Sequence, residues 1–231
     1  MIKALYLQLV NADPESRKLR ELIGRYVKAD ALILDVGCGY GRNLEQLERG
    51  GFSNVTGIDI NPQIVMANKE RGLNCIGITD LNAGVGKFDL ILMSHVIEHF
   101  SPLDLKSFID NYLEFLLPNG YLVIATPLMS DYFYDDFDHV KPYQPAGILQ
   151  VFGKGNAQIQ YYGKNKLALR DLWFRKGRYR LSFFKANYIK TRWTRIVQIV
   201  TFASAFLFFI SRGFIGKKDA WVGVFQKIDV E

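Results

Sequence analysis

Residues 32–42 read LILDVGCGYGR, an apolar run that ends in glycines at positions 37, 39 and 41. A short apolar run bounded by turn residues is consistent with a buried strand. Glycines clustered at its end indicate a turn that adopts positive φ or lets the backbone approach a ligand closely. The stretch therefore predicts a strand whose carboxyl end opens into a ligand-binding turn.

The segments around this stretch alternate between helix and strand patterns. Helices are expected over residues 14–28, 43–50 and 62–72, from Ser101 to the Pro-Asn-Gly at 118–120, and in a short segment after a polar, aromatic-rich loop. Strands are expected over residues 31–37, 54–60, 74–80, 88–96 and 121–127, at an edge around 158–163, and at 220–228. Short apolar strands separated by helices predict a mostly parallel sheet with helices on both faces and ligands at its carboxyl edge.

The glycine spacing differs from two common nucleotide-binding turns. A P-loop needs Lys followed by Ser or Thr after its glycines, and a dinucleotide turn reads G-x-G-x-x-G, whereas this turn reads G-x-G-x-G. Asp35, inside the strand, suits a cationic ligand better than a pyrophosphate. Asp59 and Asp80 end the next two expected strands, where they can bind a ribose and an adenine amine. The three carboxylates predict a nucleoside with a cationic amino-acid tail, which describes S-adenosylmethionine.

The chain resembles the class I S-adenosylmethionine-dependent methyltransferases. Five stretches carry the resemblance, in the family's order and spacing across residues 31–127: LDVGCGYGR, GIDI, TDL, FDLILMSHVIEHF and LLPNGYLVIATP. The resemblance implies that the glycine turn approaches the methionine and ribose, and that Asp35 orients the methionine end. It also implies that Asp59 binds the ribose, that Ile60 packs on the adenine, and that Ser94 lies near the methionine tail. The cofactor-binding residues expected from it are Asp35, Gly37, Gly39, Gly41, Asp59, Ile60, Asp80, Leu81 and Ser94.

The resemblance also implies a Rossmann-like, seven-stranded α/β sheet with a C-terminal helical elaboration. We expect one domain over residues 1–231, with a cofactor-binding half at 1–127 and an acceptor-side half at 128–231. An apolar amphipathic insertion is expected at about 190–214. The alternative for Asp59 and Asp80 is a structural role as helix caps or turn formers.

The three histidines of the chain all fall at the expected active edge, after the fourth and fifth strands. His139 or His99 is a candidate general base, because an imidazole titrates near neutral pH. Alternatively, His95, Glu98, His99 and His139 hold a divalent metal, which is not the expected outcome. The small-RNA 3′-end methyltransferases and the ubiquinone-pathway O-methyltransferases have a similar E-x-x-E-H run, although His95 replaces its first glutamate here. A third reading gives these residues structural roles only.

The acceptor is expected to be a glycan, sugar nucleotide or glycolipid precursor, methylated on oxygen. FDHVKPYQPAGI resembles the THVRPY stretch of bacterial methyltransferases that act on glycan chains and sugar nucleotides. The loop before it offers polar groups at Asp135, Asp136, Asp138 and Lys141 and flat rings at Tyr132, Phe133, Tyr134 and Tyr143. The alternatives are an RNA or quinone O-methyltransferase, and a non-catalytic protein that binds S-adenosylmethionine.

The net charge of +6 is unevenly distributed along the chain. Residues 1–140 contain 12 Lys and Arg against 19 Asp and Glu, whereas residues 141–231 contain 17 against 4. The basic half is expected to attract anions such as a phosphorylated acceptor, an acidic membrane surface or, less favourably, nucleic acid.

Within the basic half, the 16 residues from Ile196 to Ser211 carry no charge. A membrane-spanning helix needs about 20 residues, so this segment is expected to pack in the core or a homodimer interface, or to lie on a membrane surface. Cys38 and Cys75 form no disulfide framework, and no secretory signal is evident. The expected location is the cytoplasm, with the inner face of the cytoplasmic membrane as the site of any peripheral association.

Overall fold

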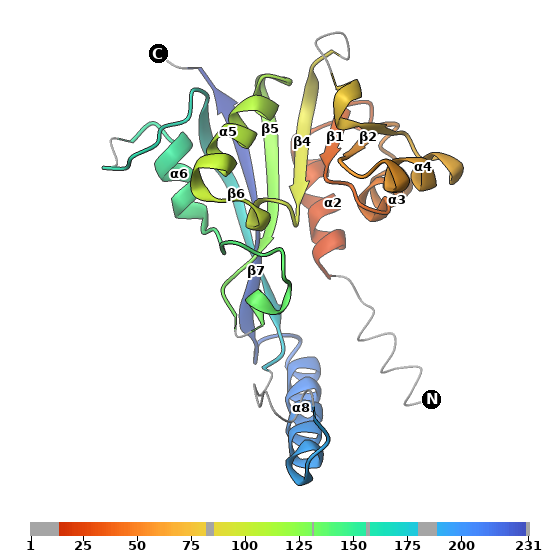
Figure 1. The fold of residues 1–231 in the computed structure, drawn as a ribbon, viewed down its shortest axis with the longest axis vertical. Helices are drawn as coiled ribbons and strands as arrows, with labels where there is room; N and C mark the ends of the chain where they lie inside the picture. Colours follow the sequence, from red (N-terminus) through yellow and green to blue (C-terminus); the bar gives the residue numbers. More distant parts are fainter. Residues whose placement is uncertain (1–13, 82–85, 131, 156–157, 180–188, 230–231) are drawn as a thin grey trace.

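The computed structural model describes residues 14–81, 86–130, 132–155, 158–179 and 189–229. Its centre is a seven-stranded sheet in the order β3-β2-β1-β4-β5-β7-β6 (Figure 1). The strands are β1 (Leu32–Val36), β2 (Asn54–Asp59), β3 (Cys75–Gly77), β4 (Phe88–Ser94), β5 (Leu116–Pro127), β6 (Lys166–Gly177) and β7 (Lys217–Ile228). The first five strands pair in parallel, and β7 pairs antiparallel with both β5 and β6. The expected Rossmann-like, mostly parallel sheet is confirmed.

Helices cover both faces of this sheet. They are α2 (Pro14–Tyr26), α3 (Arg42–Arg49), α4 (Pro62–Glu70), α5 (Pro102–Leu113) and α6 (Pro145–Phe152). A further helix, α8 (Arg192–Ile210), lies outside these layers. Short 3-10 turns occur at η1 (Ile78–Asp80), η3 (Ile97–His99) and η4 (Phe133–Asp135).

Successive side chains of each strand point to opposite faces of the sheet, so the core has two layers. Ile33, Leu90 and Leu92 pack with residues of α2 and α3, whereas their neighbours Leu34 and Ile91 pack with residues of α5 and α6. Because of this alternation, strands that are apolar at every position require helices on both sides. The continuous apolar runs of the sequence therefore account for the three-layer arrangement.

Several expected elements differ from the structure. The expected edge strand at 158–163 is wrong, because the described residues there are irregular and the edge strand is β6, within the basic stretch that follows. Only Cys75–Gly77 of the third expected strand is extended, and the strand expected at 121–127 begins at Leu116 instead. It pairs with β4 through a register shift that accommodates Pro118.

α8 does not pack in the core. It lies at the far end of β6 and β7, away from the helices that flank the sheet (Figure 1), and none of its residues is buried. Within the described part of the chain, α8 is the helix whose length and hydropathy would suit a membrane span. The alternative in which this segment fills the core is therefore wrong.

Candidate active site

The glycine turn after β1 requires glycine at each of its three positions. Gly37, Gly39 and Gly41 have φ values of 70°, 51° and 76°, in the left-handed region that other residues rarely adopt. A Cβ at Gly37 would lie 2.7 Å from Val96 Cγ2, and one at Gly41 would lie 2.5 Å from Leu73 Cδ1. A Cβ at Gly39 would meet no atom within 4 Å. The turn is thus packed at its two ends and open at its centre.

Asp59 joins the end of β2 to this turn. Its carboxylate is buried and accepts hydrogen bonds from the backbone N–H of Gly39, at 3.0 Å, and of Asn61, at 2.9 Å. Each carboxylate oxygen can accept a further bond, so the turn-forming role and a ligand-binding role are compatible. The next side chain, Ile60, is 78% exposed and offers an apolar surface beside the turn.

Asp35 is a buried carboxyl group whose burial is only partly compensated by its surroundings. It lies within β1, is fully buried, and neither of its oxygens has a hydrogen-bond partner among the described residues. Burial raises the pKa of Asp35 to about 7, although the side chains of Asn43 and Arg42 partly oppose this. A buried carboxyl group without a partner is costly, and a cationic ligand beside the turn would reduce that cost.

The remaining predicted cofactor residues follow the same edge of the sheet. Asp80 lies in η1 and accepts the backbone N–H of Gly77 at 3.1 Å, which is a turn-forming contact. Leu81 is half-buried beside it, and Ser94 is buried as the last residue of β4. The open glycine turn and the carboxyl group of Asp35 fit a nucleoside with a cationic tail, and these neighbours extend the site along the strand ends.

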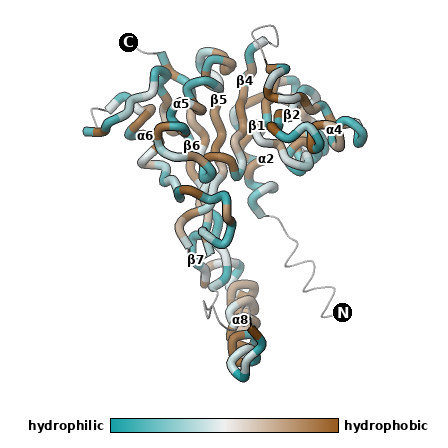
Figure 2. Tube along the Cα trace, viewed as in Figure 1, coloured by the Kyte–Doolittle hydropathy of each residue, from teal (hydrophilic) through white to brown (hydrophobic). Residues whose placement is uncertain are grey.

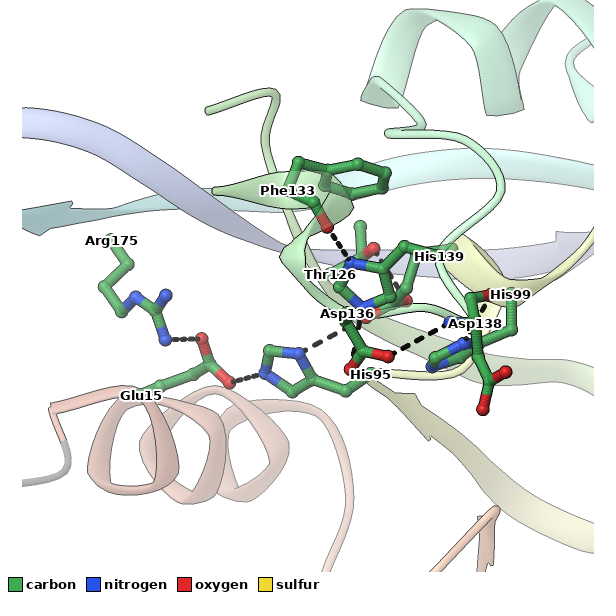
Figure 3. A network of polar contacts seen from close by, with 10 residues as sticks. Glu15, His95, His99, Thr126, Phe133, Asp136, Asp138, His139 and Arg175 are labelled. Carbon is green, nitrogen blue, oxygen red and sulfur yellow. Dashed lines mark hydrogen bonds and ion pairs between the residues drawn. The ribbon is translucent and has the colours of Figure 1, made fainter. Parts of the chain in front are cut away.

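His95 belongs to a network of ion pairs rather than to a metal cluster (Figure 3). Its Nε2 lies 2.7 Å from Glu15 of α2, its Nδ1 lies 3.3 Å from Glu98, and Glu15 also pairs with Arg175 of β6 at 2.9 Å. Burial lowers the pKa of His95, but the carboxylates of Glu15 and Glu98 outweigh burial and raise it to about 9. Among the described residues, the ligand atoms that converge are those of Glu98, His99 and His139, so His95 falls outside the proposed four-residue metal set.

Glu98, His99 and His139 are brought together by the 3-10 turn after β4 and the loop after β5. One potential ligand atom from each residue lies within 4.8 Å of those of the other two. Nδ1 of His99 lies 3.1 Å from the carbonyl of Asp138, and Nδ1 of His139 lies 2.7 Å from the carbonyl of Phe133 (Figure 3). Since a carbonyl only accepts, both Nδ1 atoms carry a hydrogen, and in a neutral ring Nε2 is then the acceptor. Nε2 of His139 lies 3.7 Å from Oδ2 of Asp136, a contact that becomes an ion pair when the ring is protonated.

This arrangement supports either a base or a metal site. A neutral histidine whose Nδ1–H is held by a carbonyl presents Nε2 as a proton acceptor, and metal-binding histidines are commonly oriented in the same way. Glu98 is fully buried, and its Oε2 accepts the hydroxyl of Thr126 at 2.9 Å. The choice between proton transfer and metal binding therefore stays open at this cluster.

The loop that carries His139 presents acids and rings to solvent. Asp135, Asp136, Asp138 and Tyr134 are exposed, as expected. Two of the rings expected to stack on an acceptor are instead buried: Phe133 packs against the His139 ring, and the Tyr143 hydroxyl donates to the carbonyl of Phe100. Phe137 is 98% exposed and was not among the rings predicted to stack on an acceptor, although an isolated aromatic residue among acids indicates such a surface.

Three residues that were not predicted also contact the histidine region: Glu15, Thr126 and Arg175. Glu15 and Arg175 lie 80 or more residues from His95 in the chain, so no local pattern links them. Thr126 lies within β5, where it reads as an ordinary strand residue.

The chain is similar to known methyltransferases over part of its length. The model of a family described as "Methyltransferase domain" matches residues 11–195. A ubiquinone biosynthesis O-methyltransferase from Caulobacter sp. (strain K31) is 30% identical over 130 residues, which cover 52% of this chain and 50% of that protein. A tRNA U34 carboxymethyltransferase from Cellvibrio japonicus is 34% identical over 108 residues, covering 42% of this chain and 33% of that protein.

Solved structures agree on the fold. A SAM-dependent methyltransferase from Archaeoglobus fulgidus aligns with a TM-score of 0.56 at 20% identity, covering 97% of this chain and 99% of that one. The alignments with the two curated relatives above span half or less of each relative's length.

Proposed function

The chain belongs to the methyltransferase domain family, and we propose that it is an S-adenosylmethionine-dependent methyltransferase that methylates a hydroxyl oxygen of a glycan or glycolipid precursor. S-Adenosylmethionine supplies a methyl group on a positively charged sulfur. The cofactor residues proposed for this chain are those of the glycine turn together with Asp35, Asp59, Ile60, Asp80, Leu81 and Ser94. Within them, Asp35 offers a carboxylate toward the cationic end, and Asp59 offers oxygens toward the ribose.

The pair of histidines carries the proposal of an oxygen acceptor. His99 and His139 lie with their ring centroids 5.0 Å apart, and each has its Nδ1–H held by a backbone carbonyl. A hydroxyl must lose its proton during or after methyl transfer, and a neutral imidazole is suited to accept it. The proton released by the acceptor hydroxyl on methylation would pass to Nε2 of His139, with His99 beside it as the second candidate base.

The exposed loop of residues 132–141 supports a sugar as the acceptor. Asp135, Asp136 and Asp138 can accept hydrogen bonds from sugar hydroxyls, while Tyr134 and Phe137 provide rings on which a sugar face can stack. The backbone N–H groups of Val140 and Lys141 donate to the carbonyl of Glu98 at 2.8 Å and 3.1 Å. These bonds fix the loop beside the histidines, so the groups proposed to bind the acceptor are attached to those proposed to react with it.

A quinol hydroxyl is the second candidate acceptor. Several of the curated relatives are ubiquinone biosynthesis O-methyltransferases, at 29–35% identity over part of the chain. The cluster of Glu98, His99 and His139 could also hold a divalent ion that gathers two adjacent oxygens. We rank this second because the acidic loop offers more hydrogen-bonding groups than a quinol requires. The basic half of the chain would suit an RNA acceptor, which is ranked below both.

The test is transfer of a labelled methyl group to defined acceptor pools. Purified protein is incubated with labelled S-adenosylmethionine and, separately, with sugar nucleotides, lipid-linked glycans, prenylated quinols and RNA, and the labelled product is identified by mass. Label is expected in a sugar-containing pool, and His139→Ala should lose that label while calorimetry still detects cofactor binding. Label found only in quinols or RNA would overturn the glycan proposal. Cofactor uptake with no transfer to any pool would instead favour a non-catalytic binding protein.

A further inference from the structure

α8 has its apolar side chains on the outside. The residues that are partly shielded recur at helical spacing and are mostly small or polar: Thr194, Val197, Thr201, Ser204, Ala205, Phe208 and Ser211. Ser204 Oγ donates to the carbonyl of Tyr179 at 2.6 Å, so this stripe faces the chain that leads away from β6. A surface helix of a water-soluble protein ordinarily shows the opposite arrangement, with its apolar stripe toward the protein.

The outer surface of α8 is a continuous apolar patch. Its exposed large side chains are Trp193, Ile196, Ile199, Val200, Phe202, Phe206, Leu207, Phe209 and Ile210, and the turn that follows adds Phe214 and Ile215. Ile199 is 67% exposed and Phe202 is 61% exposed. Figure 2 shows this hydrophobic helix projecting beyond the body of the protein. Exposed apolar surface of this extent marks an interaction site.

The segment that carries α8 is rich in cations, and its nearest acid in the sequence, Asp219 of β7, pairs with Arg175 of β6. Between Leu172 and Lys218 the sequence contains eleven Lys and Arg and no Asp or Glu. Lys176 of β6 lies opposite Lys218 of β7, and the next pair is Gly177 with Lys217. Cations therefore gather at the base of the arm, by which we mean α8 and the segments that connect it to β6 and β7. Arg192 and Arg195 begin the helix and Arg212 follows its end. This pattern is complementary to an anionic surface.

The arm leaves the sheet at the same edge as the candidate active site. Pro127, the last residue of β5, pairs with Ala220 near the start of β7, and the N–H of Leu128 donates to the carbonyl of Asp219 at 2.9 Å. The glycine turn and the histidines also follow the carboxyl ends of the parallel strands. A surface that receives α8 therefore lies on the side of the molecule where the acceptor would enter.

We propose that α8 docks the protein on an anionic lipid bilayer, with the helix lying in one leaflet. Both connections of the helix return to one place, because Gly177 of β6 pairs with Lys217 of β7. Crossing the bilayer would carry the connecting residues 178–191, which include several cations, through the hydrocarbon. Insertion into a single leaflet buries the apolar surface and leaves the cations at the headgroups.

A second copy of the chain fits this surface less well. A two-fold interface pairs the same patch with itself, so two arms rich in Lys and Arg and lacking acids would face each other. Like charges brought together in this way oppose association. The proposed docking does not depend on which acceptor is methylated. The delivery of a lipid-linked acceptor to the site, by contrast, rests on the function proposed above.

Vesicle flotation of the full chain tests the docking. Vesicles of phosphatidylcholine with and without phosphatidylglycerol are compared for the wild type, for Ile199→Ser/Phe202→Ser/Phe206→Ser on α8, and for Met66→Ser/Leu103→Ser as a control at exposed apolar positions elsewhere. The wild type and the control are expected to float with the anionic vesicles, and the α8 variant should bind at least about tenfold more weakly. Calorimetry with S-adenosylhomocysteine confirms that each variant is folded.

Depth and charge provide two further measurements. Bromine-labelled acyl chains should quench the fluorescence of Trp193, and the quenching should be lost in Trp193→Phe. Lys217→Glu/Lys218→Glu should weaken anionic binding more than Lys69→Glu/Lys87→Glu.

The proposal is overturned if the wild type fails to float, if the α8 variant floats as well as the wild type, or if α8 instead supports a dimer that the variant abolishes. Methyl transfer to a detergent-solubilised acceptor, assayed in parallel, separates this proposal from the function above. Transfer without flotation rejects only the docking, and flotation without transfer rejects only the function.

Discussion

Replacing Asp35 by Asn should stabilise the cofactor-free protein at pH 8 and weaken its binding of S-adenosylmethionine. Asp35 is fully buried without a hydrogen-bond partner among the described residues, and its pKa is raised from 3.8 to about 7. The raised pKa means that the folded protein retains a proton that the unfolded chain releases. The unfolding free energy of the wild type should therefore fall as the pH rises from about 4 to about 7, and then level off.

The magnitude follows from the size of the shift. Each pH unit between the two pKa values removes about 1.4 kcal/mol, so ionising this group at its buried site costs up to about 4 kcal/mol. Asn has nearly the same shape and carries no charge, so the variant should not show this loss. The ammonium group of the cofactor supplies a countercharge only for the carboxylate, so the stabilisation by bound cofactor should be larger in the wild type than in Asp35→Asn.

Chemical denaturation at pH 5 and pH 8, with and without S-adenosylhomocysteine, measures both effects. Asp30→Asn, which removes an exposed carboxylate at the end of the preceding loop, serves as the control and should behave as the wild type does. If Asp35→Asn destabilises the cofactor-free protein equally at both pH values, or binds the cofactor as tightly as the wild type, then Asp35 is not an uncompensated group that awaits a cation.

Four further predictions follow from the site. Gly41→Ala should unfold more readily than Gly39→Ala in a denaturant titration, because its Cβ would lie 2.5 Å from Leu73 whereas that of Gly39 meets open space; the left-handed φ alone should cost Gly39→Ala about 1 kcal/mol, and equal losses would contradict the packing. His139→Ala should reduce kcat for methyl transfer by about 10²-fold to 10⁴-fold, the usual contribution of a general base, with cofactor affinity retained; an unchanged kcat would remove His139 from the reaction. Exhaustive chelation should leave methyl transfer unchanged, and a loss that one divalent ion restores would assign Glu98, His99 and His139 to a metal instead. Glu15→Gln should lower the unfolding free energy by about 2 kcal/mol, because it removes the buried charge that pairs with both His95 and Arg175 and leaves them only Glu98 and Asp219 as carboxylate partners; a stability equal to that of the wild type would show that the network adds nothing to folding.

The sequence predicted the fold well where a residue type has a single structural role, as glycine has at positive φ and as a continuous apolar run has in a buried strand. The three glycines adopt positive φ in the structure, and the continuous apolar strands are covered on both faces. β6 escaped prediction because it is an edge strand rich in Lys and Arg, with only half-buried residues along most of its length. β5 was expected to begin at residue 121, because Pro118 is typical of a turn before a strand. In the structure β5 begins at Leu116, and a register shift in its pairing with β4 accommodates Pro118.

The candidate site was predictable to the extent that strand ends converge. Asp35 and Asp59 lie at the ends of β1 and β2, and the histidines follow β4 and β5. Since these strands are parallel, topology alone brings the residues to one edge of the sheet. The ion pairs that Glu15 makes with His95 and Arg175 could not be anticipated, because Glu15 comes from the first described helix and Arg175 from the last but one strand. The burial of Phe133 and Tyr143 also depends on tertiary packing, which no local spacing reveals.

A crystal structure of the protein with S-adenosylhomocysteine bound tests this site most directly. The ribose hydroxyls are expected on Asp59, the adenine against Ile60, the amino group toward Asp35, and the sulfur toward His99 and His139. A ligand whose sulfur faces away from both histidines, or whose ribose lies elsewhere than at Asp59, would contradict this arrangement.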